Sequence, residues 1–115
     1  MAGVTSMDAA AIDDPVLKEI TVRLVQAYEP ECVYLFGSKA RDEDHPDSDY
    51  DLMVIVTEDT PPHRQRSKLA YECLWGVRAA ADVLVWTREA FDRKRHLKSS
   101  LPGTILREGK ILYAS

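Results

Sequence analysis

The chain has 115 residues, of which 45% are apolar and 30% are charged, and this is typical of one globular domain. One segment accounts for the formal charge of −4, because six of the 19 acidic residues lie between Asp42 and Asp51. The rest of the chain carries 15 basic against 13 acidic residues. The longest apolar run, Leu52 to Val56, is far shorter than the roughly 20 residues that cross a bilayer. No basic segment precedes an apolar stretch at the N-terminus, so we expect a cytoplasmic protein without a membrane segment.

The chain opens with a weakly patterned segment, residues 1–12, which we expect to be a mobile leader before a single domain at residues 13–115. Asp14 followed by Pro15 predicts the start of a helix, with a side-chain acceptor at the cap and proline in the first turn. Apolar residues then recur at helical spacing until Pro30, where the predicted helix ends.

Two buried strands are predicted next. Residues Cys32 to Phe36 are aromatic and aliphatic, and Gly37-Ser38 closes them as a turn. Lys39 to Glu43 can start a short helix, and the acidic loop then leads to a second strand, Tyr50 to Thr57. Its continuous apolar stretch is typical of a strand that is covered on both faces.

The second half of the chain again alternates helices and strands. The expected elements are a weakly amphipathic helix, a strand, a helix capped by Thr87, a short helical segment and a last apolar strand: His63–Ala80, Asp82–Trp86, Thr87–Leu97, Leu101–Leu106 and Ile111–Tyr113. This order predicts an α/β (α+β) fold, with a small mixed β-sheet and flanking helices.

Three aspartates at the starts of predicted strands indicate a metal site. Asp49 and Asp51 are two positions apart, so in a strand they face the same side with Cα atoms roughly 6.6 Å apart. Their carboxylates repel each other unless a cation lies between them, and hard oxygen ligands favour Mg²⁺, Mn²⁺ or Ca²⁺. If the strand that begins at Asp82 lies alongside, the three acids can hold two ions, the arrangement that drives in-line phosphoryl displacement.

The turn at Gly37-Ser38 suits a phosphate group. A glycine between a strand and a helix lets backbone N–H groups approach phosphate oxygens closely. Arg41 can add a bidentate phosphate contact, although neutralising its acidic neighbours is nearly as good an explanation for it.

Each feature also has a plain structural explanation. A Gly-Ser pair is often only a turn, and Asp82 can cap a strand or pair with Arg78. The acids from Asp47 to Glu58 partly match a calcium-binding EF-hand loop, but Leu52 replaces its required glycine and the neighbouring prolines oppose the flanking helices. It is the conjunction of turn, acid pair and third acid that favours a metal-phosphate site.

The motif resembles a known signature. Gly37-Ser38, ten intervening residues, the Asp49-x-Asp51 pair and Asp82 on a later strand are similar to the pattern of the DNA polymerase beta-like nucleotidyltransferase superfamily. Within it, Gly-Ser-Lys-Ala-Arg leading to Ser-Asp-Tyr-Asp-Leu most resembles the minimal nucleotidyltransferases (MNT), including the MntA-type antitoxins of HEPN/MNT toxin–antitoxin pairs. The resemblance covers nearly the whole predicted domain and implies the polymerase beta-like nucleotidyltransferase fold.

The resemblance also implies an activity: transfer of AMP from ATP, with two Mg²⁺ ions, to a hydroxyl of a HEPN ribonuclease toxin, tyrosine being the expected acceptor. It implies that Gly37 and Ser38 hold the triphosphate and that Asp49 and Asp51 bind both metal ions. Asp82 would bind one ion and help to deprotonate the acceptor hydroxyl. A hetero-oligomer with the toxin is expected, because one short domain leaves no room for its own acceptor-binding domain.

Two other functions stay open. The chain can be a binding antitoxin that neutralises its partner without catalysis, although the three intact acids oppose this. It can also be a small-molecule nucleotidyltransferase of the aminoglycoside-modifying kind, which the lack of a C-terminal helical domain disfavours.

The remaining features predict less. The basic segment Arg93 to Lys98 is either a solvated helix face or a partner-binding surface, while the isoelectric point of about 5.3 disfavours direct nucleic-acid binding. Trp75 and Trp86 are expected in the core rather than as a platform for adenine. Cys32 and Cys73 are expected to be core thiols, since no spacing suggests a metal site or a disulfide.

Overall fold

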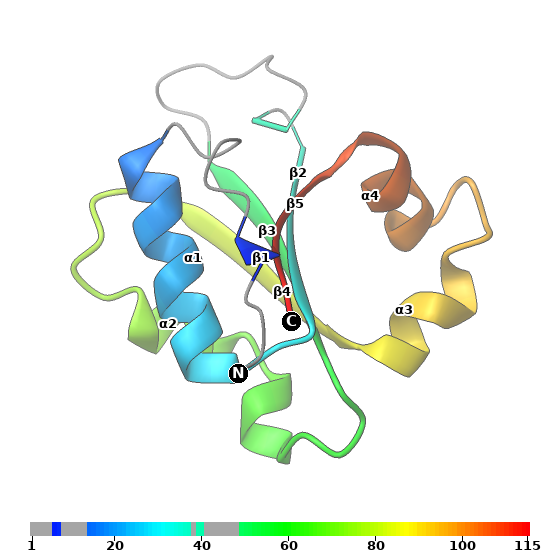
Figure 1. Cartoon of the computed structure of the whole chain (residues 1–115), viewed down its shortest axis with the longest axis horizontal. Helices are drawn as coiled ribbons and strands as arrows, with labels where there is room; N and C mark the ends of the chain where they lie inside the picture. Colours follow the sequence, from blue (N-terminus) through cyan, green and yellow to red (C-terminus); the bar gives the residue numbers. More distant parts are fainter. Residues whose placement is uncertain (1–5, 8–13, 38, 41–48) are drawn as a thin grey trace.

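A five-stranded mixed sheet separates two pairs of helices, with α1 and α2 on one side and α3 and α4 on the other (Figure 1). The computed structural model describes residues 6–7, 14–37, 39–40 and 49–115. The strands are Ser6–Met7 (β1), Cys32–Phe36 (β2), Tyr50–Val56 (β3), Ala81–Thr87 (β4) and Lys110–Ala114 (β5). The helices are Pro15–Tyr28 (α1), Lys68–Cys73 (α2), Arg88–Lys94 (α3) and Leu101–Glu108 (α4), with a 3-10 helix at Pro62–Gln65 (η1).

The strand order is β1-β5-β2-β3-β4, which leaves β4 at one edge. β3 and β4 run parallel, whereas β2 is antiparallel to both β3 and β5. β1, within the segment expected to be a leader, pairs with β5 through Ser6 and Met7. The predicted mixed α/β architecture is confirmed, and no helix among the described residues is long and apolar enough to cross a membrane.

Alternation along β3 supplies a core on each face of the sheet. Leu52, Val54 and Val56 pack with α1 and α2, while Met53 and Ile55 pack with Phe91 and Ile105, from α3 and α4. The side-chain period of two therefore places Asp51, in step with Met53, on the α3–α4 face. The long apolar run of β3 is explained by this double covering.

Helix α1 begins as its sequence predicts. The carboxylate of Asp14 accepts hydrogen bonds from the backbone N–H groups of Val16 and Leu17, at 2.9 and 3.3 Å. The helix ends at Tyr28, and Glu29 follows in a left-handed conformation with φ 46°.

The long helix expected at His63–Ala80 is wrong. Two prolines start the short 3-10 helix η1, and α2 covers only Lys68–Cys73. Gly76 then adopts φ +92°, a left-handed conformation that an α-helix cannot contain. The core position predicted for Trp75 is also wrong, since the residue is 85% exposed. Both cysteines are free, with Cys32 buried and Cys73 half-buried.

Candidate active site

Asp51 and Asp82 lie side by side on the parallel strands β3 and β4. They are register partners, and adjacent strands lie about 4.8 Å apart. Asp82 alternates with Leu84 and Trp86, which pack on the α3–α4 core, so both carboxylates belong to the same face of the sheet. Two acids 31 positions apart in sequence therefore meet at one end of the sheet.

Gly37 brings the predicted phosphate turn against this pair. It follows β2 with φ +77°, a conformation that favours glycine. A Cβ atom at this position would lie 3.2 Å from Cγ of Asp51 and closer still to Oδ2. The absence of a side chain at Gly37 thus leaves the space that the Asp51 carboxylate occupies.

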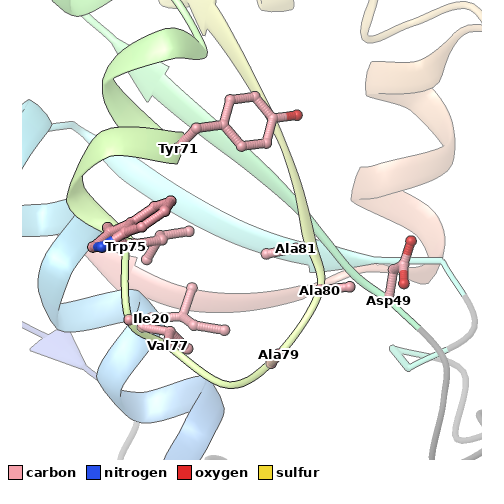
Figure 2. Close-up of a pocket in the computed structure, with 10 residues that line it drawn as sticks. Ile20, Asp49, Tyr71, Trp75, Val77, Ala79, Ala80 and Ala81 are labelled. Atoms are coloured by element: carbon pink, nitrogen blue, oxygen red, sulfur yellow. The ribbon is translucent and has the colours of Figure 1, made fainter.

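Asp49 lies just before β3, two residues from Asp51, and is exposed. It borders a cavity of about 580 Å³ at the start of β4, with Tyr71 and Trp75 on the opposite side (Figure 2). The other lining residues are mostly small and apolar: Ile20, Leu74, Gly76, Val77, Ala79, Ala80 and Ala81.

The other two residues predicted to bind nucleotide, Ser38 and Arg41, lie outside the described residues, as do four acids of the linker, Asp42, Glu43, Asp44 and Asp47. Asp82 forms no ion pair with Arg78 within the described part of the chain.

Tyr50 lies between Asp49 and Asp51 in the sequence, and its side chain points to the α1–α2 face of the sheet. Its hydroxyl donates a hydrogen bond to the Asp14 carboxylate, and Lys39 Nζ lies 4.4 Å from the centre of its ring. Burial raises the pKa of Asp14, but the hydrogen bonds from Tyr50, Leu17 and Val16, with the charge of Lys39, outweigh burial and leave it below its ordinary value.

The cluster of Asp14, Lys39 and Tyr50 was not predicted from the sequence. The available signal was strand alternation, which turns Tyr50 away from its two neighbours and toward α1. The cluster ties the cap of α1, the turn after Gly37 and the start of β3 together.

The donor chemistry fits a divalent cation. Within the described ranges, no three His, Cys, Asp or Glu side chains are gathered as a ready ligand set. Asp49 and Asp82 are exposed and Asp51 is half-buried, so their carboxylates can turn toward an ion. Hard carboxylate oxygens suit Mg²⁺, Mn²⁺ or Ca²⁺, the ions that the three aspartates predict.

The chain matches a known protein family over most of its length. The family model described as Polymerase beta, Nucleotidyltransferase matches residues 18–115. The chain belongs to this nucleotidyltransferase family. The predicted membership is therefore confirmed, and the match includes Gly37 and all three aspartates. No curated protein matches the chain.

Two solved structures share the fold of this nucleotidyltransferase. One is a toxin–antitoxin with AMP-PNP, at 20% sequence identity and a TM-score of 0.58, covering 85% of this chain and 73% of that chain. The other is a mutant of the toxin–antitoxin MntA-HpeT, at 18% identity and a TM-score of 0.56, with the same coverage of both chains. At these sequence identities, the similarity shows a shared fold alone.

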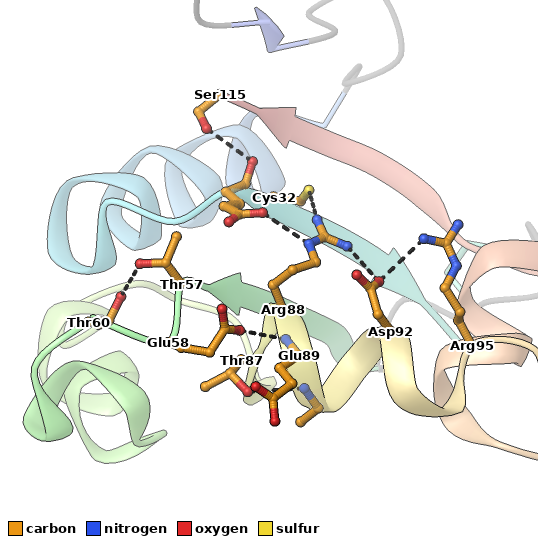
Figure 3. Close-up of polar contacts among 12 residues, drawn as sticks. Cys32, Thr57, Glu58, Thr60, Thr87, Arg88, Glu89, Asp92, Arg95 and Ser115 are labelled. Carbon is orange, nitrogen blue, oxygen red and sulfur yellow. Dashed lines mark hydrogen bonds and ion pairs between the residues drawn. The ribbon is translucent and has the colours of Figure 1, made fainter.

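Two arginines in and before the basic segment, Arg95 and Arg88, pair with acidic residues of this chain (Figure 3). Arg88 donates to Glu31 at 3.0 Å, to Asp92 at 3.3 Å and to Sγ of Cys32 at 3.1 Å. Burial disfavours its charge, but the hydrogen bonds to Glu31 and Asp92 and the nearby Cys32 raise the pKa of Arg88 above its ordinary value. Arg88 therefore joins α3 to the start of β2.

Proposed function

We propose that this chain transfers AMP from ATP, with Mg²⁺, to a hydroxyl group of a partner protein, and that the partner is a HEPN ribonuclease toxin for which this chain is the antitoxin. The observation that carries the proposal is the pairing of Asp51 with Asp82 across β3 and β4, with the Gly37 turn against Asp51. Acids for metal and a turn for phosphate thus lie within one end of the sheet.

Each residue of the site has its own role in the proposed reaction. Bound Mg²⁺ neutralises phosphate charge and favours ionisation of the acceptor hydroxyl. Asp49 and Asp51 hold the ions, and Asp82 holds one of them and accepts the proton of the acceptor. The backbone at Gly37 and Ser38 binds the triphosphate, and Arg41 adds a charged contact.

The transfer balances without a further reactant. The acceptor oxygen attacks the α-phosphorus of ATP, and an O–P bond forms as the bond between the α-phosphorus and the bridging oxygen breaks. Pyrophosphate leaves, and the proton of the hydroxyl passes to Asp82 and then to solvent. The product carries AMP in a phosphodiester link.

Two observations support a protein partner. The two solved structures described above are toxin–antitoxins, and one of them contains a nucleotide analogue. The mutant MntA-HpeT carries two aspartate-to-glutamate changes two positions apart, the spacing of Asp49 and Asp51 here.

The test is label transfer to the protein encoded beside this chain. With Mg²⁺ and ATP labelled at the α-phosphate we expect labelled partner, and with ATP labelled at the γ-phosphate we expect none. The variants Asp49→Ala/Asp51→Ala and Asp82→Asn should transfer no label. Protection of cells from the partner by the double mutant would show instead that this chain acts by binding alone.

A further inference from the structure

We propose that the outer edge of β4, the edge that faces away from β3, binds an extended segment of the partner protein as an added β-strand. We further propose that an acidic side chain of this segment binds beside Arg93 and Lys94, at the end of α3. The docking does not require AMP transfer, but the position that it gives to the acceptor rests on the proposed function.

Strand β4 lacks most of the features that protect the edge of a sheet. It pairs in parallel with β3 through all seven residues, from Ala81 to Thr87, without a bulge. Its sequence contains no proline, lysine or arginine. A long and regular edge of this kind readily pairs with another polypeptide. The strand therefore suits docking by strand addition.

The pairing with β3 determines which backbone groups of β4 face outward. The N–H of Tyr50 donates to the carbonyl oxygen of Ala80 at 3.0 Å. Successive residues of a strand direct their backbone groups to opposite sides, so the even-numbered residues of β4 bond to β3, and Val83 and Val85 face away from it. Within the described ranges, the backbone groups of these two valines have no other hydrogen-bond partner. Their N–H and C=O groups are available to an added strand.

A cavity of about 430 Å³ lies at the end of this edge. Val85 and Thr87 of the edge line it, together with Trp86, with Ala90 from α3 and with Gln65 from η1. The cavity thus borders the same backbone that the added strand would pair with. A side chain of that strand can enter the cavity while its backbone bonds to β4.

The charge of the cavity favours an acidic side chain. Arg93 and Lys94, in the last turn of α3, line it, and none of its described lining residues is acidic. Arg93 pairs with Glu89 at 2.5 Å, whereas Lys94 has no ion pair within the described part of the chain. A carboxylate complements this charge. Because a polypeptide supplies the regular N–H and C=O groups that pair with a strand, the occupant is a protein segment with an acidic residue.

The same edge leads from the cavity to the proposed metal site. Asp82 and Trp86 lie on the α3–α4 face of β4, four residues and about 13 Å apart. Trp86 borders the cavity together with Lys94. In an added strand, side chains four positions apart also share one face. With its acidic side chain beside Lys94, the segment therefore carries the acceptor hydroxyl four residues away, beside Asp82.

The first experiment measures amide hydrogen exchange by NMR, in the full chain alone and in complex with the protein encoded beside it. In the free chain, the amides of Val83 and Val85 should exchange faster than those of Leu84 and Trp86, which bond to β3. In the complex, exchange at the two valines should slow by roughly tenfold or more, and much less at Leu84 and Trp86. Docking through side chains alone would not produce this alternation.

The second experiment measures the Kd for the partner protein by calorimetry. Val85→Pro removes the outward N–H, at an edge position that tolerates proline, and should raise this Kd roughly tenfold or more. Val85→Thr retains the N–H and should recover most of the binding. Lys94→Glu should also weaken binding by roughly tenfold, whereas Lys18→Glu, the same change of charge on α1, should stay within about twofold. Tm verifies folding, and the Kd for Mg²⁺-ATP should stay within about twofold in all four variants.

Two results would overturn the docking surface while AMP transfer stands. One is a complex in which the amides of Val83 and Val85 exchange as fast as in the free chain. The other is a dimer of the isolated chain, seen by analytical ultracentrifugation, with these amides already protected, which would assign the edge to a second copy. Protection at both valines without AMP transfer would retain the docking surface and overturn the proposed function. Two proteins that do not bind each other would overturn both.

Discussion

The carboxylate of Asp51 occupies the space that a side chain at Gly37 would fill. Position 37 also has φ +77°, so the turn excludes other residues twice, by backbone conformation and by contact with Asp51. The relation explains why a glycine stands at the end of β2: it lets the acid that lies beside Asp82 reach the turn.

We expect Gly37→Ala to lose most AMP transfer. The left-handed conformation costs an alanine about 1–2 kcal/mol of stability, and displacement of Asp51 by an ångström can cost roughly a hundredfold in rate. Gly76→Ala is the control, because Gly76 has φ +92° and nothing within 4 Å of a Cβ. It should lose similar stability in urea unfolding yet bind Mg²⁺-ATP normally. Wild-type transfer by Gly37→Ala would refute the close contact with Asp51.

Asp82→Asn should separate stability from function. Without metal, removing one of two neighbouring carboxylates relieves repulsion of about 0.5–1 kcal/mol, so Tm should hold or rise. Added Mg²⁺ should raise the Tm of the wild-type chain by binding the folded state, and raise that of Asp82→Asn much less. Equal Mg²⁺ responses of the two proteins, measured by calorimetry, would remove Asp82 from the ion site.

The Asp14 carboxylate should stabilise the fold only above acidic pH. Its folded-state pKa lies below the ordinary value, so its contribution is complete above about pH 4 and is lost as the pH falls through the folded pKa. Asp14→Asn keeps an acceptor for the helix cap and Tyr50 but loses the charge, and should cost about 1 kcal/mol at pH 7. Chemical unfolding from pH 7 to pH 3 should show this difference shrinking; a difference independent of pH would contradict it.

Arg88 should matter for stability far more than Arg93. Arg88 is 26% exposed and bonds Glu31, Asp92 and Cys32, whereas Arg93 is 68% exposed and pairs, among the described residues, with Glu89 in its own helix. Arg88→Ala should cost about 2 kcal/mol, because it leaves partly buried acceptors unpaired. Arg93→Ala should cost about 0.5 kcal/mol or less. Urea unfolding would contradict this if both variants lost the same stability.

Strands β2 to β5 could be predicted from local sequence, whereas β1 lies in the segment that was expected to be a leader. β3 and β4 are apolar runs bounded by turn residues, and their predicted bounds differ by about one residue from the structure. The helix predicted from His63 to Ala80 was wrong, because Pro62 and the left-handed conformation of Gly76 interrupt a segment with only weak helical periodicity.

Within the site, sequence alone could predict the residue types but not their contacts. The face shared by Asp49 and Asp51 follows from strand alternation, whereas the register of Asp51 with Asp82 depends on how two distant strands pair. The exposure of Trp75 could not be predicted either, since it depends on where α2 ends and on the turn at Gly76.

A crystal structure with Mn²⁺ and a non-hydrolysable ATP analogue tests the central claim most directly, because the anomalous signal locates the ion. We predict Mn²⁺ bound by carboxylate oxygens of Asp49, Asp51 and Asp82 at about 2.1 Å, with the triphosphate against the turn at Gly37. Mn²⁺ or the nucleotide bound elsewhere, with these three carboxylates free of any ion, would contradict the account.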